Sequence, residues 1–340
     1  IGLYGRGDRR TTAWRATLYL GLASMVLLAA LLMIGTQAGF TFSGLKDFMA
    51  SGRELAHAEL IGALLIAGFG TLISLFPFHS WAAPAYASAP APVAMMHAGV
   101  LKKFGLYGLF MFQPLMETGF LPWTNILLVL LVCNVIWVGY VTVNQKRLDL
   151  LLGNSSVMHM GYIFLAFAAL VVSGSAEANP WALKGAALLM LAHGLTIALL
   201  FLLCGQIEKQ TGTLEINSLG GLSTRLPRMA FVFGLAGMAS IGLPGLANFP
   251  GEFMVFFSGF AGFSNGFGPV QIATILCLWG LVIGAVYMLR AYRNIFQGDL
   301  SKASAYATGL QPSERAANCF LVIALAVFGF FPTLVLQFFS

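Results

Sequence analysis

The chain has 340 residues, of which 59% are hydrophobic and only 9% are charged, with a net charge of +6. A soluble globular domain carries about 25% charged residues, so this composition excludes a soluble enzyme and a disordered chain. The sequence also excludes an outer-membrane barrel, whose strands alternate polar and apolar residues in segments of about ten. We therefore predict an all-α fold, a polytopic bundle of transmembrane helices.

Nine segments are apolar over the roughly 20 residues that a transmembrane helix needs. The seventh is too long for one plain helix, and it carries two prolines and three glycines between 242 and 252. We expect a broken helix there, because irregular backbone at membrane depth is tolerated only where protein buries it or where it lines a hydrated cavity. In chain order the nine segments cover 14–36, 56–77, 92–114, 122–144, 150–173, 181–205, 228–262, 271–292 and 316–339.

The basic residues of the loops predict an orientation. With nine spans, the segment before the first span lies on the same side as the loops after spans two, four, six and eight. Cytoplasmic loops are enriched in Lys and Arg, so we predict that this side is cytoplasmic. The opposite side carries only three such residues, Lys46, Arg53 and Lys184. The first side carries thirteen: Arg6, Arg9, Arg10, Arg15, Lys146, Arg147, Lys209, Arg225, Arg228, Arg290, Arg293, Lys302 and Arg315.

Four ionisable residues inside the predicted spans are the main functional candidates: Lys103, His159, His193 and Glu252. A charge at membrane depth costs roughly 3 kcal/mol on insertion scales and is functional by default. Lys103 lies in the third span, and a lysine can load and release a proton, unlike an arginine. Its neighbour Lys102 is a further possible candidate, but the two side chains are about 100° apart on a helix and cannot both face the same cavity. His159 and His193 lie in the fifth and sixth spans, where a neutral imidazole accepts on one nitrogen and donates from the other. Glu252 follows the break in the seventh span, and together these residues predict a proton path.

Two further candidates are weaker, and other site chemistry is lacking. His97 precedes Lys103 by six residues, while Asp149 stands beside Lys146 and Arg147 and is interpreted as part of an interfacial charge cluster. The four cysteines are scattered in apolar runs, which favours packing over a metal site or a disulfide framework. We find no phosphate loop, catalytic triad or dinucleotide fingerprint. We therefore expect no cofactor, metal or nucleic acid on this chain.

Several strings resemble the antiporter-like subunits of respiratory complex I. They are FPFHSWAAPAYASAPAPVAMMHAGVLKKFGLYG, SSVMHMGY, AHGLTIALLFLLCG followed by GGL, and GLPGLANFPGEF, in the order that this family has them. The similarity is closest to subunit M, the mitochondrial subunit-4 type, and it covers essentially the whole chain. It implies a fold of fourteen helices with two inverted five-helix repeats. The nine spans correspond to helices six to fourteen, so we expect 1–340 to form a single antiporter-like domain that lacks the first five helices, in keeping with a start at Ile1.

The resemblance also assigns residues. It implies that Lys103 is the central lysine, that His159 and His193 are the relay histidines, and that Glu252 is the terminal glutamate of the broken helix. One departure is that Leu72 stands where the family has a lysine, five residues before the proline of its PxHxW motif. A second is that Asp149 stands where a lysine is expected, with Lys146 and Arg147 one turn earlier.

The main hypothesis is a proton-translocating membrane subunit of a complex I-type NADH:quinone oxidoreductase, without a redox site of its own. NADH, FMN, iron–sulfur clusters and quinone are then expected on partner subunits, and protons are the only substrate of this chain. The expected partners are neighbouring antiporter-like subunits and lipids, in a bacterial cytoplasmic membrane. The alternatives are a D-type subunit of a multisubunit Na⁺/H⁺ antiporter, a membrane-bound hydrogenase subunit, and a structural spacer that has lost pumping, which Leu72 favours.

Overall fold

The computed structural model describes residues 1–261 and 266–339, which form helices and no β-strand. Short π and 3₁₀ segments interrupt or extend the helices: η1 (His97–Leu101), η2 (Gln113–Leu115), η3 (Leu121–Trp123), η4 (Ile216–Ser218) and η6 (Gln337–Phe339). The α-helices are α1 (Arg9–Ala38), α2 (Phe42–Ala50), α3 (Ala58–Ile73), α4 (Ala82–Ser88), α5 (Ala91–Met96), α6 (Lys103–Phe112), α7 (Glu117–Phe120), α8 (Thr124–Val143), α9 (Leu148–Ser173), α10 (Pro180–Thr211), α11 (Leu222–Arg225), α12 (Pro227–Ser240), α13 (Asn248–Ser258), α14 (Pro269–Phe296), α15 (Pro312–Phe330) and α16 (Thr333–Leu336).

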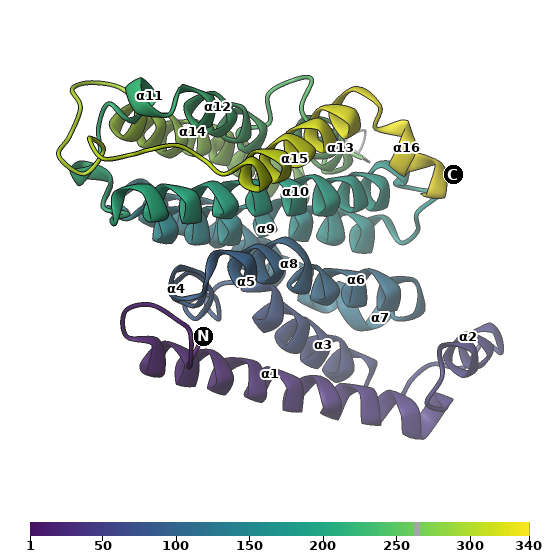
Figure 1. Ribbon diagram of the computed structural model, residues 1–340. Helices are drawn as coiled ribbons and strands as arrows, with labels where there is room; N and C mark the ends of the chain where they lie inside the picture. Colours follow the sequence, from purple (N-terminus) through teal and green to yellow (C-terminus); the bar gives the residue numbers. More distant parts are fainter. Residues whose placement is uncertain (262–265, 340) are drawn as a thin grey trace.

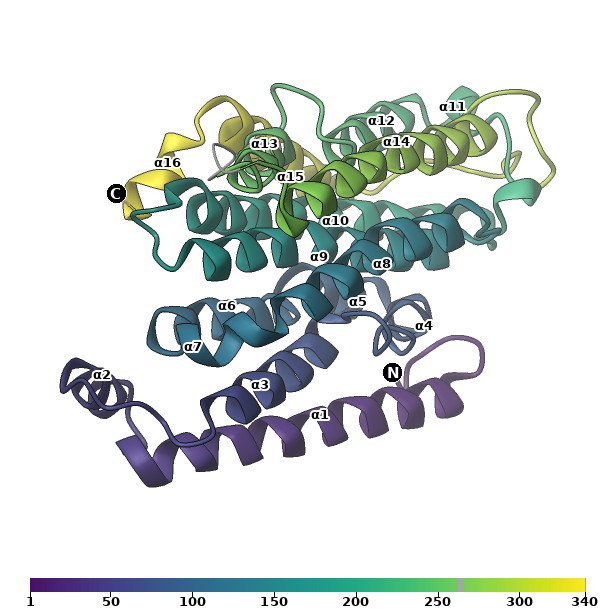
Figure 2. The same cartoon turned by 180° about the vertical axis from the view of Figure 1, so that it is seen from behind.

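The helices form a layered bundle around α9. Figure 1 shows α1 and α3 on one side, α9 and α10 in the middle, and α12, α14 and α15 on the other side. Seen from behind, α8 and α14 lie next to each other on the near face (Figure 2). Nearly all side chains of α9 are buried, because helices pack against it on every side. A helix that is apolar all round is expected in such a central position.

Each of the nine predicted spans contains at least one α-helix, but not all are single helices. Residue 262, the last of the seventh predicted span, lies outside the described residues. Six described helices are long and apolar enough to cross a membrane: α1, α8 with the residues before it, α9, α10, α14 and α15. The second span is the shorter apolar helix α3. The third consists of α5, η1 and α6, and the seventh consists of α12 and α13.

The third predicted span is not a uniform α-helix. Its middle, His97–Leu101, is a π-helical turn, in which the amide of Lys102 donates to the carbonyl of His97 at 3.3 Å. The extra residue in the turn shifts the register of the side chains that follow. Such turns occur often at functional sites, and this one stands directly before the two buried lysines.

The predicted break in the seventh span is confirmed. Helix α12 ends at Ser240, and α13 begins at Asn248. Between them Gly242 and Gly245 have φ values of 79° and 93°, a left-handed region that favours glycine. Pro244 has no amide hydrogen and so cannot continue the helix.

One end of the bundle is tied together by ion pairs. Arg6, before α1, pairs with Glu208 near the end of α10. The next residue, Lys209, pairs with Glu314 in the first turn of α15 at 2.8 Å. Three of the segments that the charge pattern placed on one side therefore meet there, which confirms that part of the arrangement. That this side is cytoplasmic stays a prediction.

The opposite end is joined by side chains that cap backbone carbonyls. The indole of Trp123 donates to the carbonyl of Glu59 at 2.9 Å, which joins the starts of α3 and α8. The amide of Asn179 donates to the carbonyl of Ser258 at 3.0 Å, which joins the start of α10 to the end of α13. These contacts agree with the predicted alternation of the spans.

Candidate functional site

The two lysines of the third span are both buried, and they point to different partners. Lys102 is completely buried, and its Nζ donates to the carbonyl oxygen of Ser156 at 3.3 Å and lies 3.4 Å from the Ser156 hydroxyl. The same Nζ lies 5.5 Å from the centre of the Tyr86 ring, a cation–π arrangement. Lys103 instead donates to the carbonyl of Ala98, inside the π-helical turn of its own span.

The Ser156 hydroxyl links the lysine to a pair of histidines. Its Oγ lies 3.3 Å from Nε2 of His193, on α10. The ring of His193 lies 5.3 Å, between centroids, from the ring of His159, which is one turn beyond Ser156 on α9. Both imidazoles are buried. The predicted histidine pair is therefore a structural pair, and the residue that the structure connects to it by hydrogen bonds is Lys102.

The imidazole of His159 lies between two carbonyl oxygens. Its Nδ1 is 2.8 Å from the carbonyl of Ser155, and its Nε2 is 2.9 Å from the carbonyl of Ser240. Carbonyl oxygens accept and do not donate, so only the doubly protonated imidazolium makes both hydrogen bonds. This geometry is suited to holding a proton.

The Ser240 carbonyl is free because of the helix break. In a continuous helix it would accept from the amide four residues later. That residue is Pro244, which has no amide hydrogen. The last carbonyls of a helix are also the negative end of its dipole, which favours a cationic side chain such as an imidazolium. The sequence of the break thus creates the acceptor that His159 uses.

Glu252 lies beyond the break, on α13, and is buried. Its Oε1 has no hydrogen-bond partner among the described residues. Its Oε2 lies against the backbone of Gly242, where a Cβ would collide with it. No hydrogen bond in the described part of the chain joins Glu252 to His159. The structure therefore brings these two predicted residues to the same break without linking them directly.

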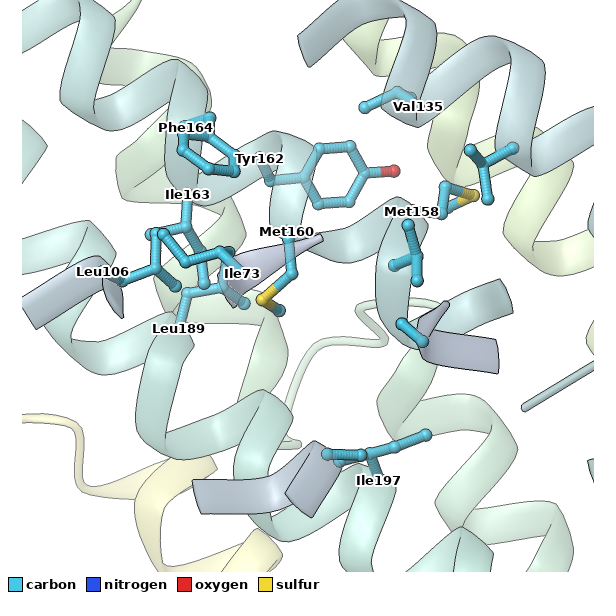
Figure 3. Close-up of a cluster of buried hydrophobic side chains, with 14 of the residues drawn as sticks. Ile73, Leu106, Val135, Met158, Met160, Tyr162, Ile163, Phe164, Leu189 and Ile197 are labelled. Atoms are coloured by element: carbon cyan, nitrogen blue, oxygen red, sulfur yellow. The ribbon is translucent and has the colours of Figure 1, made fainter. Parts of the chain in front are cut away.

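Tyr162 occupies the space between His159 and α13. Its ring lies 5.5 Å from His159 and 5.1 Å from Phe256, between centroids, and its hydroxyl is buried without a hydrogen-bond partner among the described residues. Figure 3 shows this phenol among apolar side chains, with Val135 and Met158 near its hydroxyl end. Buried apolar side chains thus surround this phenol, and electrostatic interactions are stronger in such surroundings than in water.

The remaining candidates lie at the margins of this site. The ring of His97 packs against those of Trp81 and Tyr86, at 5.7 and 5.4 Å between centroids. The carboxylate of Asp149 accepts two hydrogen bonds from the Arg147 guanidinium, from Nε at 3.1 Å and from Nη2 at 2.7 Å, which agrees with the interpretation of a charge cluster.

Leu72 occupies a partly exposed position on α3 outside the apolar core. The described hydrogen bonds that join Lys102, Ser156 and His193 do not involve Leu72.

Sequence reasoning missed three residues of the site. Ser156 lies three residues before His159 in SSVMHMGY, so its position almost one turn away was a usable signal. Tyr162 follows His159 by three residues and could have been found in the same way. Ser240 could have been found by counting four residues back from Pro244. Among the described residues, no group of His, Cys, Asp and Glu side chains is arranged to hold a metal ion.

Curated proteins similar to the chain are quinone oxidoreductase subunits. It is 35% identical over 347 residues to NAD(P)H-quinone oxidoreductase chain 4 1 of Synechococcus elongatus, covering 99% of this chain and 62% of the relative. It is 34% identical over 331 residues to chain 4 2 of Microcystis aeruginosa, covering 94% of this chain and 57% of the relative. The chain thus spans about three fifths of the length of these relatives. Their names agree with the predicted subunit-4 type.

Solved structures give the same fold. A chain of respiratory complex I from Thermus thermophilus matches with a TM-score of 0.87 and 26% identity, over 99% of this chain and 68% of the other. A chain of the Mrp complex from Dietzia matches with a TM-score of 0.81 over 97% of this chain and 67% of the other, but at 19% identity this likeness shows the fold alone. Both matched chains are parts of larger complexes. Residues 1–276 match the family described as NADH:quinone oxidoreductase/Mrp antiporter, TM, and the chain belongs to this family of integral membrane proteins.

Proposed function

We propose that this chain is a proton-translocating, subunit-4-type membrane subunit of an NADH:quinone oxidoreductase. The names of its relatives and its likeness to a complex I chain support this function. In this role the chain is a non-redox subunit of an enzyme, and NADH, FMN, iron–sulfur clusters and quinone belong to partner subunits. Its partners are neighbouring antiporter-like subunits and lipids, in an energy-transducing membrane, for which we propose the bacterial cytoplasmic membrane.

The observation that carries the proposal is the placement of His159. Its imidazole meets two carbonyl acceptors, one of which the helix break leaves free. A purely structural histidine needs only one acceptor, because the neutral ring has a single N–H. The second acceptor is useful when the ring carries an additional proton. Proton transfer is therefore the chemistry for which this site is built.

The proposed path runs from the buried lysines to Glu252. A proton leaves the lysine region near Lys103, reaches His193, and passes to His159, whose ring centroid lies 5.3 Å from that of His193. From His159 it crosses the break to Glu252, whose unpartnered oxygen can accept it. The break exposes backbone groups that water can bind, and Tyr162 borders this last step. Redox energy released in other subunits drives the changes in protonation.

The test uses membrane vesicles that contain the intact assembly. Proton uptake driven by NADH is measured together with NADH oxidation, and their ratio is compared between the wild type, Glu252→Gln and Lys103→Ala. We expect the ratio to fall, or turnover to collapse, in both variants. An unchanged ratio in both variants would contradict pumping by this chain and favour the spacer.

The likeness to an Mrp chain keeps a second function open to the same experiment. A D-type antiporter subunit, or the equivalent subunit of a membrane-bound hydrogenase, would use the same path with another source of energy. Sodium-dependent proton exchange without NADH would favour the antiporter. The hydrogen-bonded series of Lys102, Ser156 and His193 is complete without a lysine at Leu72, which argues against the spacer.

A further inference from the structure

Lys102 is deeply buried, and hydrogen bonds connect its ammonium through Ser156 to His193. Its ammonium is completely buried, and the described residues contain no carboxylate paired with it. A buried charge without an opposite charge is unfavourable. Its polar contacts are the backbone and hydroxyl oxygens of Ser156, at 3.3 and 3.4 Å, and the face of the Tyr86 ring at 5.5 Å.

The Ser156 hydroxyl is the only one of these partners that can pass a proton on. A hydroxyl accepts and donates at once, whereas a carbonyl only accepts. Its next neighbour is Nε2 of His193 at 3.3 Å. Three side chains from three elements, α9, α10 and the turn before α6, therefore form one continuous series.

We propose that Lys102 is the lysine that delivers protons to the histidine pair. The Lys102 ammonium gives a proton to the Ser156 oxygen, and the Ser156 hydroxyl gives its own proton to Nε2 of His193. Lys102 becomes a neutral amine, Ser156 keeps one proton, and a neutral His193 becomes an imidazolium. The step requires the tautomer of His193 that carries its hydrogen on Nδ1.

Lys103 has a different task in this arrangement. Its ammonium is bound by the Ala98 carbonyl and interacts electrostatically with Lys102. Like charges repel most strongly where little water screens them. When the neutral amine of Lys103 takes up a proton, the new positive charge therefore pushes the proton of Lys102 toward Ser156. The other ionisable neighbours of this series are His97, His159 and Tyr86.

The inference rests on the proposed function, and its test separates the two. The intact assembly in membrane vesicles is compared in five variants: Lys102→Leu, Lys102→Arg, Ser156→Ala, Ser156→Thr and Glu252→Gln. The exposed Lys46→Leu on α2 is the control for loss of a lysine. The amount of assembled complex is measured by native gel electrophoresis, and the ratio of protons to electrons is then measured for each.

We expect Lys102→Leu, Lys102→Arg and Ser156→Ala to lose the share of pumped protons that Glu252→Gln loses. Lys102→Arg decides between roles, because arginine keeps the charge and the hydrogen-bond donors but does not release a proton. Ser156→Thr keeps a hydroxyl and should pump.

Three outcomes would overturn the inference alone: full pumping in Lys102→Leu while Glu252→Gln is impaired, rescue by Lys102→Arg, or normal pumping in Ser156→Ala. Full pumping in Glu252→Gln as well would overturn the proposed function instead. If Lys102→Leu does not assemble, the Lys102→Arg and Ser156 variants still decide.

Discussion

Nε2 of His159 lies 2.9 Å from the carbonyl oxygen of Ser240, at the residue where α12 ends. The hydrogen bond crosses between two helices and depends on the missing amide hydrogen of Pro244. The two hydrogen bonds that suit His159 to hold a proton thus depend on the break in the neighbouring helix.

Replacing Pro244 by alanine tests this dependence. Pro244→Ala supplies an amide that can bind the Ser240 carbonyl, so it competes with His159 for the same acceptor. We expect a lower ratio of protons to electrons in vesicles. Pro250→Ala is the control, because Pro250 lies in the first turn of α13, where the amides of a helix lack intrahelical partners. Normal pumping in Pro244→Ala would show that the free carbonyl is not needed.

Gly242 is predicted to be intolerant of a side chain for two separable reasons. Its φ of 79° costs a non-glycine residue about 1 kcal/mol, and a Cβ there would collide with Oε2 of Glu252. Gly298 has the same φ, but a Cβ there would have nothing within 4 Å. Both alanine variants should therefore lose similar backbone energy in thermal unfolding, while only Gly242→Ala loses proton uptake. Equal uptake in the two variants would contradict a role for the Glu252 position.

Gln206 and Asn318 form a buried reciprocal amide pair between α10 and α15. Each donates to the other, at 3.1 and 2.9 Å. We expect Gln206→Leu to lower the free energy of unfolding by about 1–3 kcal/mol, because it leaves the amide of Asn318 without its partner. The double variant with Asn318→Leu should recover much of this loss. A double-mutant cycle in detergent measures the coupling, and additive losses would contradict it.

His79, in the segment between α3 and α4, predicts a pH dependence. Burial lowers its pKa below the ordinary 6.5, more than a hydrogen bond to Pro77 raises it, and the charge of Arg15 lowers it further. The unfolded chain then binds the proton more readily than the folded one, so stability falls as the pH drops below 6.5. His79→Phe keeps a ring against Phe76 and should lose less stability than the wild type over that range. Parallel pH curves of thermal unfolding would contradict this.

The sequence was sufficient for the spans, the break and the identity of the buried groups, because these follow from hydropathy, proline and charge. The resemblance assigns the central role to Lys103, whereas the hydrogen bonds of the described residues connect Lys102 to Ser156 and His193. The π-helical turn before the two lysines changes which lysine faces Ser156, and no periodicity of 3.6 residues contains that turn. The role of the Ser240 carbonyl could not be read from residue types either, because every residue has a backbone carbonyl. Contacts between distant segments, such as Gln206 with Asn318, need the packed bundle.

Pro244 acts on the site because it has no amide hydrogen. Pro244 leaves the carbonyl oxygen of Ser240, four residues earlier, without a helical donor. Its replacement therefore acts on the chemistry of a histidine in another helix without adding bulk or charge. Screens that score substitutions by size or polarity would rank such a change as mild. Within this family, prolines in interrupted helices therefore merit inspection for the acceptor they release as well as for the bend they impose.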